Sequence, residues 1–129
     1  MNKKITTRES RALEALCKDA YGRPLLTMEQ QLEFANRFKN GDMEALQKLY
    51  YFNLRFVLVV AKKYLDKGKT LEELIVAGNY GIEVAAVRYN KQRGVTFLFY
   101  MVWVIRKCVQ KLVSNELVLN EKSNSEVGE

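Results

Sequence analysis

The C-terminal half of the sequence mixes aromatic and basic side chains in a way that could bind an unpaired nucleic-acid strand. The residues concerned are Tyr89, Lys91, Arg93, Phe97, Phe99, Tyr100, Trp103, Arg106, Lys107, Gln110 and Lys111. On a helix, positions i, i+3, i+7 and i+10 share one face, and four of these residues have that spacing: Tyr100, Trp103, Lys107 and Gln110. Bases stack on aromatic rings while lysine and arginine neutralise phosphates. This face therefore predicts a site for single-stranded nucleic acid.

The same pattern has a second interpretation, in which Tyr100 and Trp103 belong to the protein core. Apolar residues share the opposite face of this helix, namely Leu98, Val102, Ile105, Val109 and Leu112. Aromatic side chains whose polar atoms find a partner could complete that core. Periodicity alone leaves both interpretations open.

The residue types needed for catalysis or metal binding are missing. The sequence has no histidine, and its two cysteines, Cys17 and Cys108, lie far apart within apolar helical patterns. Neither a zinc site nor an activated nucleophile is indicated, and no glycine-rich phosphate loop occurs. We therefore expect a binding protein rather than an enzyme, with reduced thiols, no cofactor and no metal.

The charge is unevenly distributed along the chain. Residues 53–111 carry eleven basic and four acidic side chains, a net charge of +7, whereas residues 112–129 have a net charge of −3. This pattern suits a polyanionic partner, although a solvated basic surface is the alternative. The apolar stretch at residues 56–61 is too short to cross a bilayer. We expect a cytoplasmic protein that is monomeric when free and does not contact a membrane.

Apolar spacing and capping residues predict an all-α fold, a compact bundle of about five helices. Thr27 and Thr70 are expected to cap helices in capping boxes with Gln30 and Glu73, and Asp42 is expected to cap a third helix. The expected helices cover residues 8–21, 28–39, 43–65, 71–88 and 96–115. Residues 1–7 are expected to form a flexible arm, residues 8–116 a single helical domain and residues 117–129 an acidic disordered tail.

One hydrophobic core is expected to unite these helices. Its members share the 3.6-residue period of core-facing positions: Leu49, Phe52, Phe56, Val59, Leu74, Ile82, Val102, Ile105 and Val109.

Five short motifs, in order and at matching spacing, resemble region 2 of the sigma-70 family of bacterial sigma factors. They are NLRFV at residues 53–57, AKKY at 61–64, GNYG at 78–81, RGVTF at 93–97 and YMVWVIR at 100–106. Upstream, residues 26–42 resemble region 1.2 of that family, and residues 7–10 resemble the N-termini of Bacteroidetes-type primary sigma factors. The resemblance covers roughly residues 5–115 and implies an all-helical domain.

The resemblance also implies partners and site residues. It implies docking on the clamp helices of the RNA polymerase core, melting of the −10 promoter element and capture of its non-template strand. The DNA-binding residues expected from the resemblance and from the aromatic–basic pattern are Asn53, Arg55, Tyr89, Arg93, Phe97, Tyr100, Trp103, Arg106, Lys107 and Gln110. Glu73 and Asn79 occupy polymerase-docking positions of the family, as do Val76 and Ala77.

The chain departs from the family pattern at several of these positions. Val76 and Ala77 stand where the family has Gln-Glu, so two polar docking contacts are lost. Val104 stands where the family has a second tryptophan, so half of the wedge against the upstream base pair is missing, and a tryptophan there is expected to improve binding to a DNA fork. Leu98 and Phe99 replace Ser-Thr with apolar bulk.

Two functions from different classes follow from these observations. The first is a minimal sigma-like factor that binds polymerase and the −10 strand. The second is a non-initiating regulatory decoy or adapter, of phage or mobile-element type, that occupies polymerase or another protein partner. The retained aromatics favour the first, and the altered docking residues and the lack of further sigma domains in this sequence favour the second.

Overall fold

The computed structural model describes residues 7–114, except for the side chain of Arg93, and within that range it contains helices and no strands. The elements are α1 (Thr7–Tyr21), α2 (Met28–Lys39), α3 (Met43–Lys62), α4 (Leu71–Arg88), the short 3-10 helix η1 (Lys91–Arg93) and α5 (Phe97–Ser114). The predicted all-α bundle of about five helices is confirmed. The predicted tail, and the predicted arm apart from Thr7, which begins α1, lie outside the described residues.

Side-chain caps determine where three of the helices begin. The Gln30 N–H donates to Thr27 Oγ1 at 3.0 Å, and the Thr27 N–H donates to Gln30 Oε1 at 2.8 Å. Thr70 and Glu73 form the same reciprocal pair before α4, at 3.1 and 2.8 Å. The Asp42 carboxylate accepts hydrogen bonds from the first backbone N–H groups of α3. All three predicted caps are confirmed, and each satisfies donors that a helix end would otherwise leave open.

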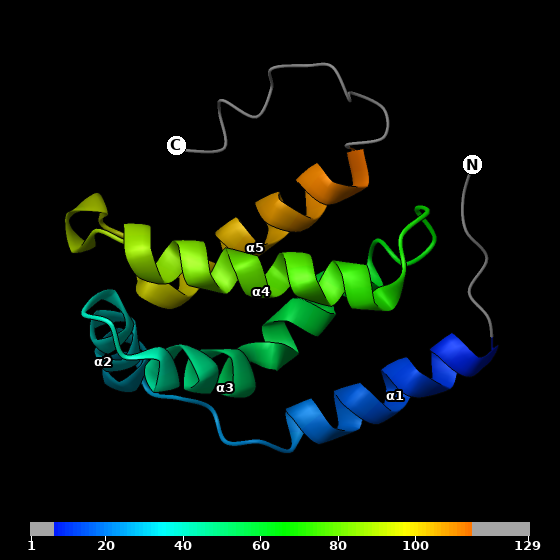
Figure 1. Cartoon of the computed structure of the whole chain (residues 1–129), viewed down its shortest axis with the longest axis horizontal. Coiled ribbons are helices and arrows are strands. Elements are labelled where there is room, and N and C mark those ends of the chain that lie inside the picture. The colour runs from blue at the N-terminus through cyan, green and yellow to red at the C-terminus, as the bar shows by residue number, and fades with distance from the viewer. Residues whose placement is uncertain (1–6, 115–129) are drawn as a thin grey trace.

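The helices pack around α4 and α3 (Figure 1). α4 runs across the middle of the molecule and makes its most extensive contact with α5, which crosses behind it. α3 lies on the other side of α4 and also contacts α1 and α2. α1 reaches the rest of the bundle mainly through α3.

Two glycines allow α4 to approach its neighbours closely on both sides. A Cβ atom added to Gly78 would lie 2.5 Å from Val57 Cγ1 on α3. One added to Gly81 would lie 2.8 Å from the Cα atom of Ile105 on α5. These distances are shorter than van der Waals contact, so any side chain at either position would push the helices apart.

The predicted core is correct for α4, correct for α5 apart from Val102, and wrong in part for α3. Five of the predicted residues are fully buried: Leu49, Leu74, Ile82, Ile105 and Val109. Phe52, Phe56 and Val102 are only partly buried. Val59 is 44% exposed and faces solvent. The second half of α3 is therefore rotated relative to the predicted stripe.

A buried polar pair explains that rotation. The inward row of α3 has a strict four-residue spacing through Ala45, Leu49, Asn53, Val57 and Ala61. Asn53 is 1% exposed and exchanges two hydrogen bonds with Gln31 of α2, at 2.8 and 2.9 Å. Because each amide satisfies the other, the pair can be buried without an unpaired polar group. The predicted stripe did not include Asn53 and followed Phe56 and Val59 instead.

Candidate nucleic-acid interface

A cluster of buried aromatic rings anchors the start of α5. Gly94 has a φ of 85°, and this left-handed residue turns the chain from η1 towards α5. The Tyr89 hydroxyl donates to the Val95 carbonyl oxygen at 2.6 Å. The Tyr89 ring packs edge-on against Phe97 and lies 5.8 Å from the ring of Tyr100. Phe97 and Tyr100 are buried, so of the two interpretations of the aromatic face the core one applies to Tyr100, which is 6% exposed.

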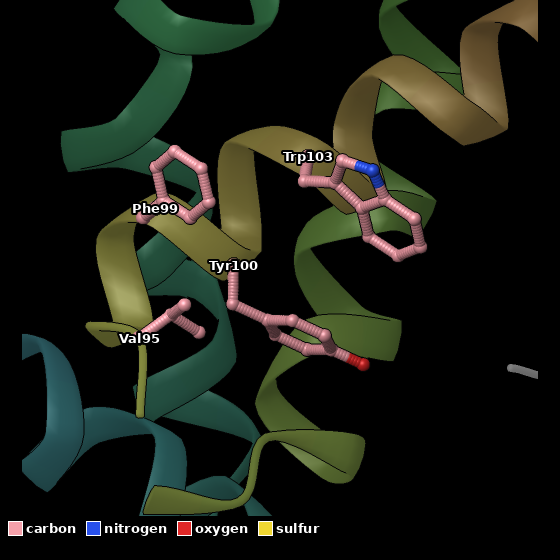
Figure 2. Close-up of a pocket in the computed structure, with 4 residues that line it drawn as sticks. All are labelled: Val95, Phe99, Tyr100 and Trp103. Carbon is pink, nitrogen blue, oxygen red and sulfur yellow. The ribbon is translucent and has the colours of Figure 1, made fainter. Parts of the chain in front are cut away.

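Trp103 and Phe99 lie on the surface above this cluster and border a shallow pocket. The pocket has a volume of about 280 Å³ and is lined by Val95, Phe99, Tyr100 and Trp103. Figure 2 shows the Phe99 and Trp103 side chains on either side of Tyr100, with Val95 just before α5. Trp103 is 38% exposed and Phe99 65% exposed, whereas the Tyr100 ring stacks beneath Trp103 at 6.2 Å. We call this the aromatic pocket; its size and apolar walls suit a planar ring.

Phe99 belongs to the aromatic–basic pattern of the sequence but was not among the expected DNA-binding residues. The signal that could have identified it is the four-residue spacing between Phe99 and Trp103, which places both on one turn-to-turn row of a helix.

One cationic side chain borders the aromatic pocket, and others are exposed on α5 and on η1. The Lys107 ammonium lies 5.5 Å from the centre of the Trp103 ring, within the range of a cation–π contact. Arg106 and Lys91 are exposed on α5 and η1. Arg93 lies in η1, and its side chain is outside the described part of the structure. Aromatic and positively charged groups thus lie side by side on one surface, as single-stranded DNA requires.

Three predicted DNA-binding residues have structural partners elsewhere. Asn53 is buried against Gln31. The Arg55 guanidinium donates to the backbone carbonyls of Tyr21 and Arg23, which ties the α1–α2 connection to α3. Gln110 donates from Nε2 to the Tyr64 hydroxyl oxygen at 2.9 Å. None of these three side chains lines the aromatic pocket, and we leave them out of the proposed base-binding site.

Val104 lies inside the protein. Its side chain is 5% exposed, and its backbone carbonyl lies on the face of α5 that meets Gly81. A larger side chain at this position has no path to the surface pocket without displacing α4.

We therefore expect Val104→Trp to lower the free energy of unfolding by about 1–3 kcal/mol, because it overpacks the α4–α5 contact. Urea unfolding followed by circular dichroism measures this difference, with Val104→Ile as a control that adds a single methylene. A Val104→Trp variant of native stability with tighter binding to a DNA fork would contradict this expectation and restore the wedge interpretation.

The predicted polymerase-docking residues lie along α4, beside a second groove. This groove has a volume of about 610 Å³ and is lined by Glu72, Glu73, Val76, Ala77, Tyr80 and Leu112. Glu73 also caps α4. Val76 is 67% exposed, and Tyr80, which the sequence analysis missed, is exposed beside it. Asn79 is partly buried, and its Oδ1 atom has no hydrogen-bond partner among residues 7–114.

Other kinds of site receive no support from the described residues. Within them, no group of three or more histidine, cysteine, aspartate or glutamate side chains could hold a metal ion. Cys17 and Cys108 are free, and burial raises the pKa of the Cys108 thiol, an effect that Lys111 partly opposes. No helix in residues 7–114 is long and apolar enough to span a membrane.

Comparison with known proteins identifies the family. The family model for Sigma-70 region 2 matches residues 49–116. The chain belongs to the sigma-70 family. It is 36% identical to the RNA polymerase sigma factor SigA of Clostridium acetobutylicum over 93 residues, which are 72% of this chain and 25% of that protein. It is 30% identical to the RNA polymerase sigma factor RpoS of Coxiella burnetii over 114 residues, which are 88% of this chain and 32% of that protein.

The family assignment confirms the resemblance found in the sequence motifs and accounts for the all-helical fold. The chain spans about a quarter to a third of the length of these two sigma-70 family relatives. The matched region contains α4, α5 and most of α3. It therefore includes both the aromatic pocket and the second groove, beside α4.

Proposed function

We propose that this chain is a sigma-like transcription factor, not an enzyme, that binds the RNA polymerase core and captures the non-template strand of a −10-type promoter element. The observation that supports this most directly is the aromatic pocket, with Trp103 exposed beside Lys107 on a region 2 domain of the sigma-70 family. In this proposal a base enters the pocket while Arg106, Lys107 and Arg93 contact phosphates. Such a factor would act in the cytoplasm, where bacterial polymerase works.

The buried rings have a supporting role in this proposal. Tyr89, Phe97 and Tyr100 hold the first turn of α5 in place, so that Phe99 and Trp103 present their faces to a base. A rigid platform loses little conformational entropy when it binds.

Fluorescence titration with single-stranded DNA tests the proposal. Trp103 is the only tryptophan, so a base that stacks on it should quench the emission of the protein. We expect about three to five phosphate contacts, which give a log–log salt dependence of about −2 to −4 for a single strand. Unchanged fluorescence at saturating DNA, or an affinity that does not depend on salt, would contradict the proposed function.

The polymerase part of the proposal places the core on α4. Glu73, Asn79 and the pair Val76–Ala77 match positions that dock polymerase in the family. Here Val76 and Ala77 make the groove apolar. This apolar surface is the observation that favours the second function, a decoy or adapter with a different protein partner.

Substituting Val76→Gln and Ala77→Glu together distinguishes the two functions. If the core polymerase docks here, we expect the double variant to bind it at least about fivefold more tightly, because one or two charge-assisted contacts, worth about 1–3 kcal/mol each, are restored. Pull-down and titration against the core polymerase of the source organism measure this. Val87→Gln, at another exposed position of α4, is the control. Unchanged or weaker binding would favour the adapter.

A further inference from the structure

We propose that Lys63 and Lys67, on either side of Tyr64 in the sequence, form a second phosphate-binding site that extends the path of single-stranded DNA beyond the aromatic pocket. This inference rests on the proposed function, because it concerns the same DNA strand. It adds a contact surface on the turn that follows α3, whereas the aromatic pocket lies on α5.

The hydrogen bond between Gln110 and Tyr64 joins the two surfaces. It spans 2.9 Å and connects the last part of α5 to the end of α3, two segments that are 46 positions apart. The chain continues as a turn from Tyr64, and the Lys67 N–H donates to the Tyr64 carbonyl oxygen at 3.2 Å. Both lysines are exposed. The end of α5 and this turn also lie towards the same end of the molecule in Figure 1.

One face of α5 leads from the pocket to this turn. Trp103, Arg106 and Gln110 are three and seven positions apart, so they lie along one side of the helix. Seven residues of helix rise by about 10 Å, a distance that a short stretch of single strand can span. A strand with one base in the aromatic pocket would thus pass Arg106 and reach Lys63 and Lys67 within a few nucleotides.

The charges on this path are available to a ligand. In the described part of the chain, no acidic side chain forms an ion pair with Lys63, Lys67 or Arg106. Asp66 lies between the two lysines in sequence and reduces the net charge of the turn, but it too is exposed and forms no ion pair there. Exposed cations without an internal partner are the groups that release counterions when they bind DNA.

The test compares two oligonucleotide lengths on the full chain. We expect the double variant Lys63→Gln, Lys67→Gln to have a weaker salt dependence for a ten-nucleotide strand. The slope of log affinity against log salt concentration should decrease in magnitude by about 1.4, which is about 0.7 for each of the two lost phosphate contacts. A dinucleotide is too short to connect the pocket with the lysines, so its Trp103 quenching and affinity should not change. Extending a short strand separately from its 5′ and 3′ ends shows which direction leads to the lysines.

A matched control separates this site from a general effect of net charge. Lys18 and Lys48 are also exposed, on α1 and on the first half of α3, and replacing both with glutamine removes the same charge. We expect this control to leave the salt dependence unchanged. Equal losses in both double variants, or no loss with Lys63 and Lys67, would overturn the inference.

The outcomes also distinguish this inference from the proposed function. If Trp103→Ala weakens binding while the lysine variant does not, the proposed function stands and the second site is rejected. If the unmodified chain binds no single-stranded DNA, both are rejected.

Discussion

Replacing Tyr100 with alanine will lower the free energy of unfolding by about 3–5 kcal/mol, the range measured when large buried aromatic side chains are truncated. The Tyr100 ring is almost completely buried and contacts the rings of Tyr89 and Trp103. Its removal leaves a cavity under the first two turns of α5. Urea unfolding monitored by circular dichroism measures the change, and any fall in DNA binding should accompany this loss of stability.

Tyr100→Phe is the matched control for this prediction, because it keeps the ring and removes the hydroxyl. We expect it to lose much less stability than the alanine variant. The contrary outcome is that Tyr100→Ala keeps the urea midpoint of the unmodified protein and loses DNA affinity. In that case the ring would be a binding surface, and the conformation that binds DNA would not be the one in which the ring is buried beneath Trp103.

Replacing Trp103 with alanine should have the opposite result. We expect the affinity for single-stranded DNA to fall by about 1–3 kcal/mol, roughly 5- to 150-fold, because a stacking surface is lost. The loss of stability should be smaller than for Tyr100→Ala, since Trp103 is partly exposed beside Lys107. Anisotropy of labelled DNA measures binding, because the variant has no tryptophan, and thermal melting is recorded on the same sample.

Tyr80→Ala provides the control for Trp103→Ala. Tyr80 is an exposed aromatic residue on α4 in the other groove, so its removal should not affect DNA binding. Equal affinity losses in the two variants would show that exposed aromatic surface acts non-specifically. An unchanged affinity of Trp103→Ala would exclude the aromatic pocket as the base-binding site and leave the adapter function as the better proposal.

The helix ends could be predicted from the sequence because the interactions that determine them are local. Thr27 with Gln30, and Thr70 with Glu73, are three positions apart, and their capping boxes need no information from other helices. The close contact between α4 and α5 could not be predicted from the sequence. The space at Gly81 is set by the backbone of Ile105 on another helix, so no local pattern reports it.

Two polar residues show what the sequence could not predict about the site. Asn53 and Arg55 were expected on the DNA surface because they match polar positions in the sigma-70 family resemblance. Their partners lie more than twenty positions away, Gln31 for Asn53 and the Tyr21 and Arg23 carbonyls for Arg55. Such pairs are visible only when the helices are assembled. Helical spacing also could not separate Trp103 from Tyr100: the two share one predicted face, yet Trp103 is partly exposed and Tyr100 is buried.

The buried pair between Gln31 and Asn53 restricts how this protein can change over generations. Replacing either residue alone with leucine leaves the other amide buried without its partner, at a cost of about 1–3 kcal/mol. Replacing both removes that cost. A lineage that moves from an amide pair to an apolar pair must therefore pass through a less stable intermediate, so substitutions at positions 31 and 53 should be inherited together.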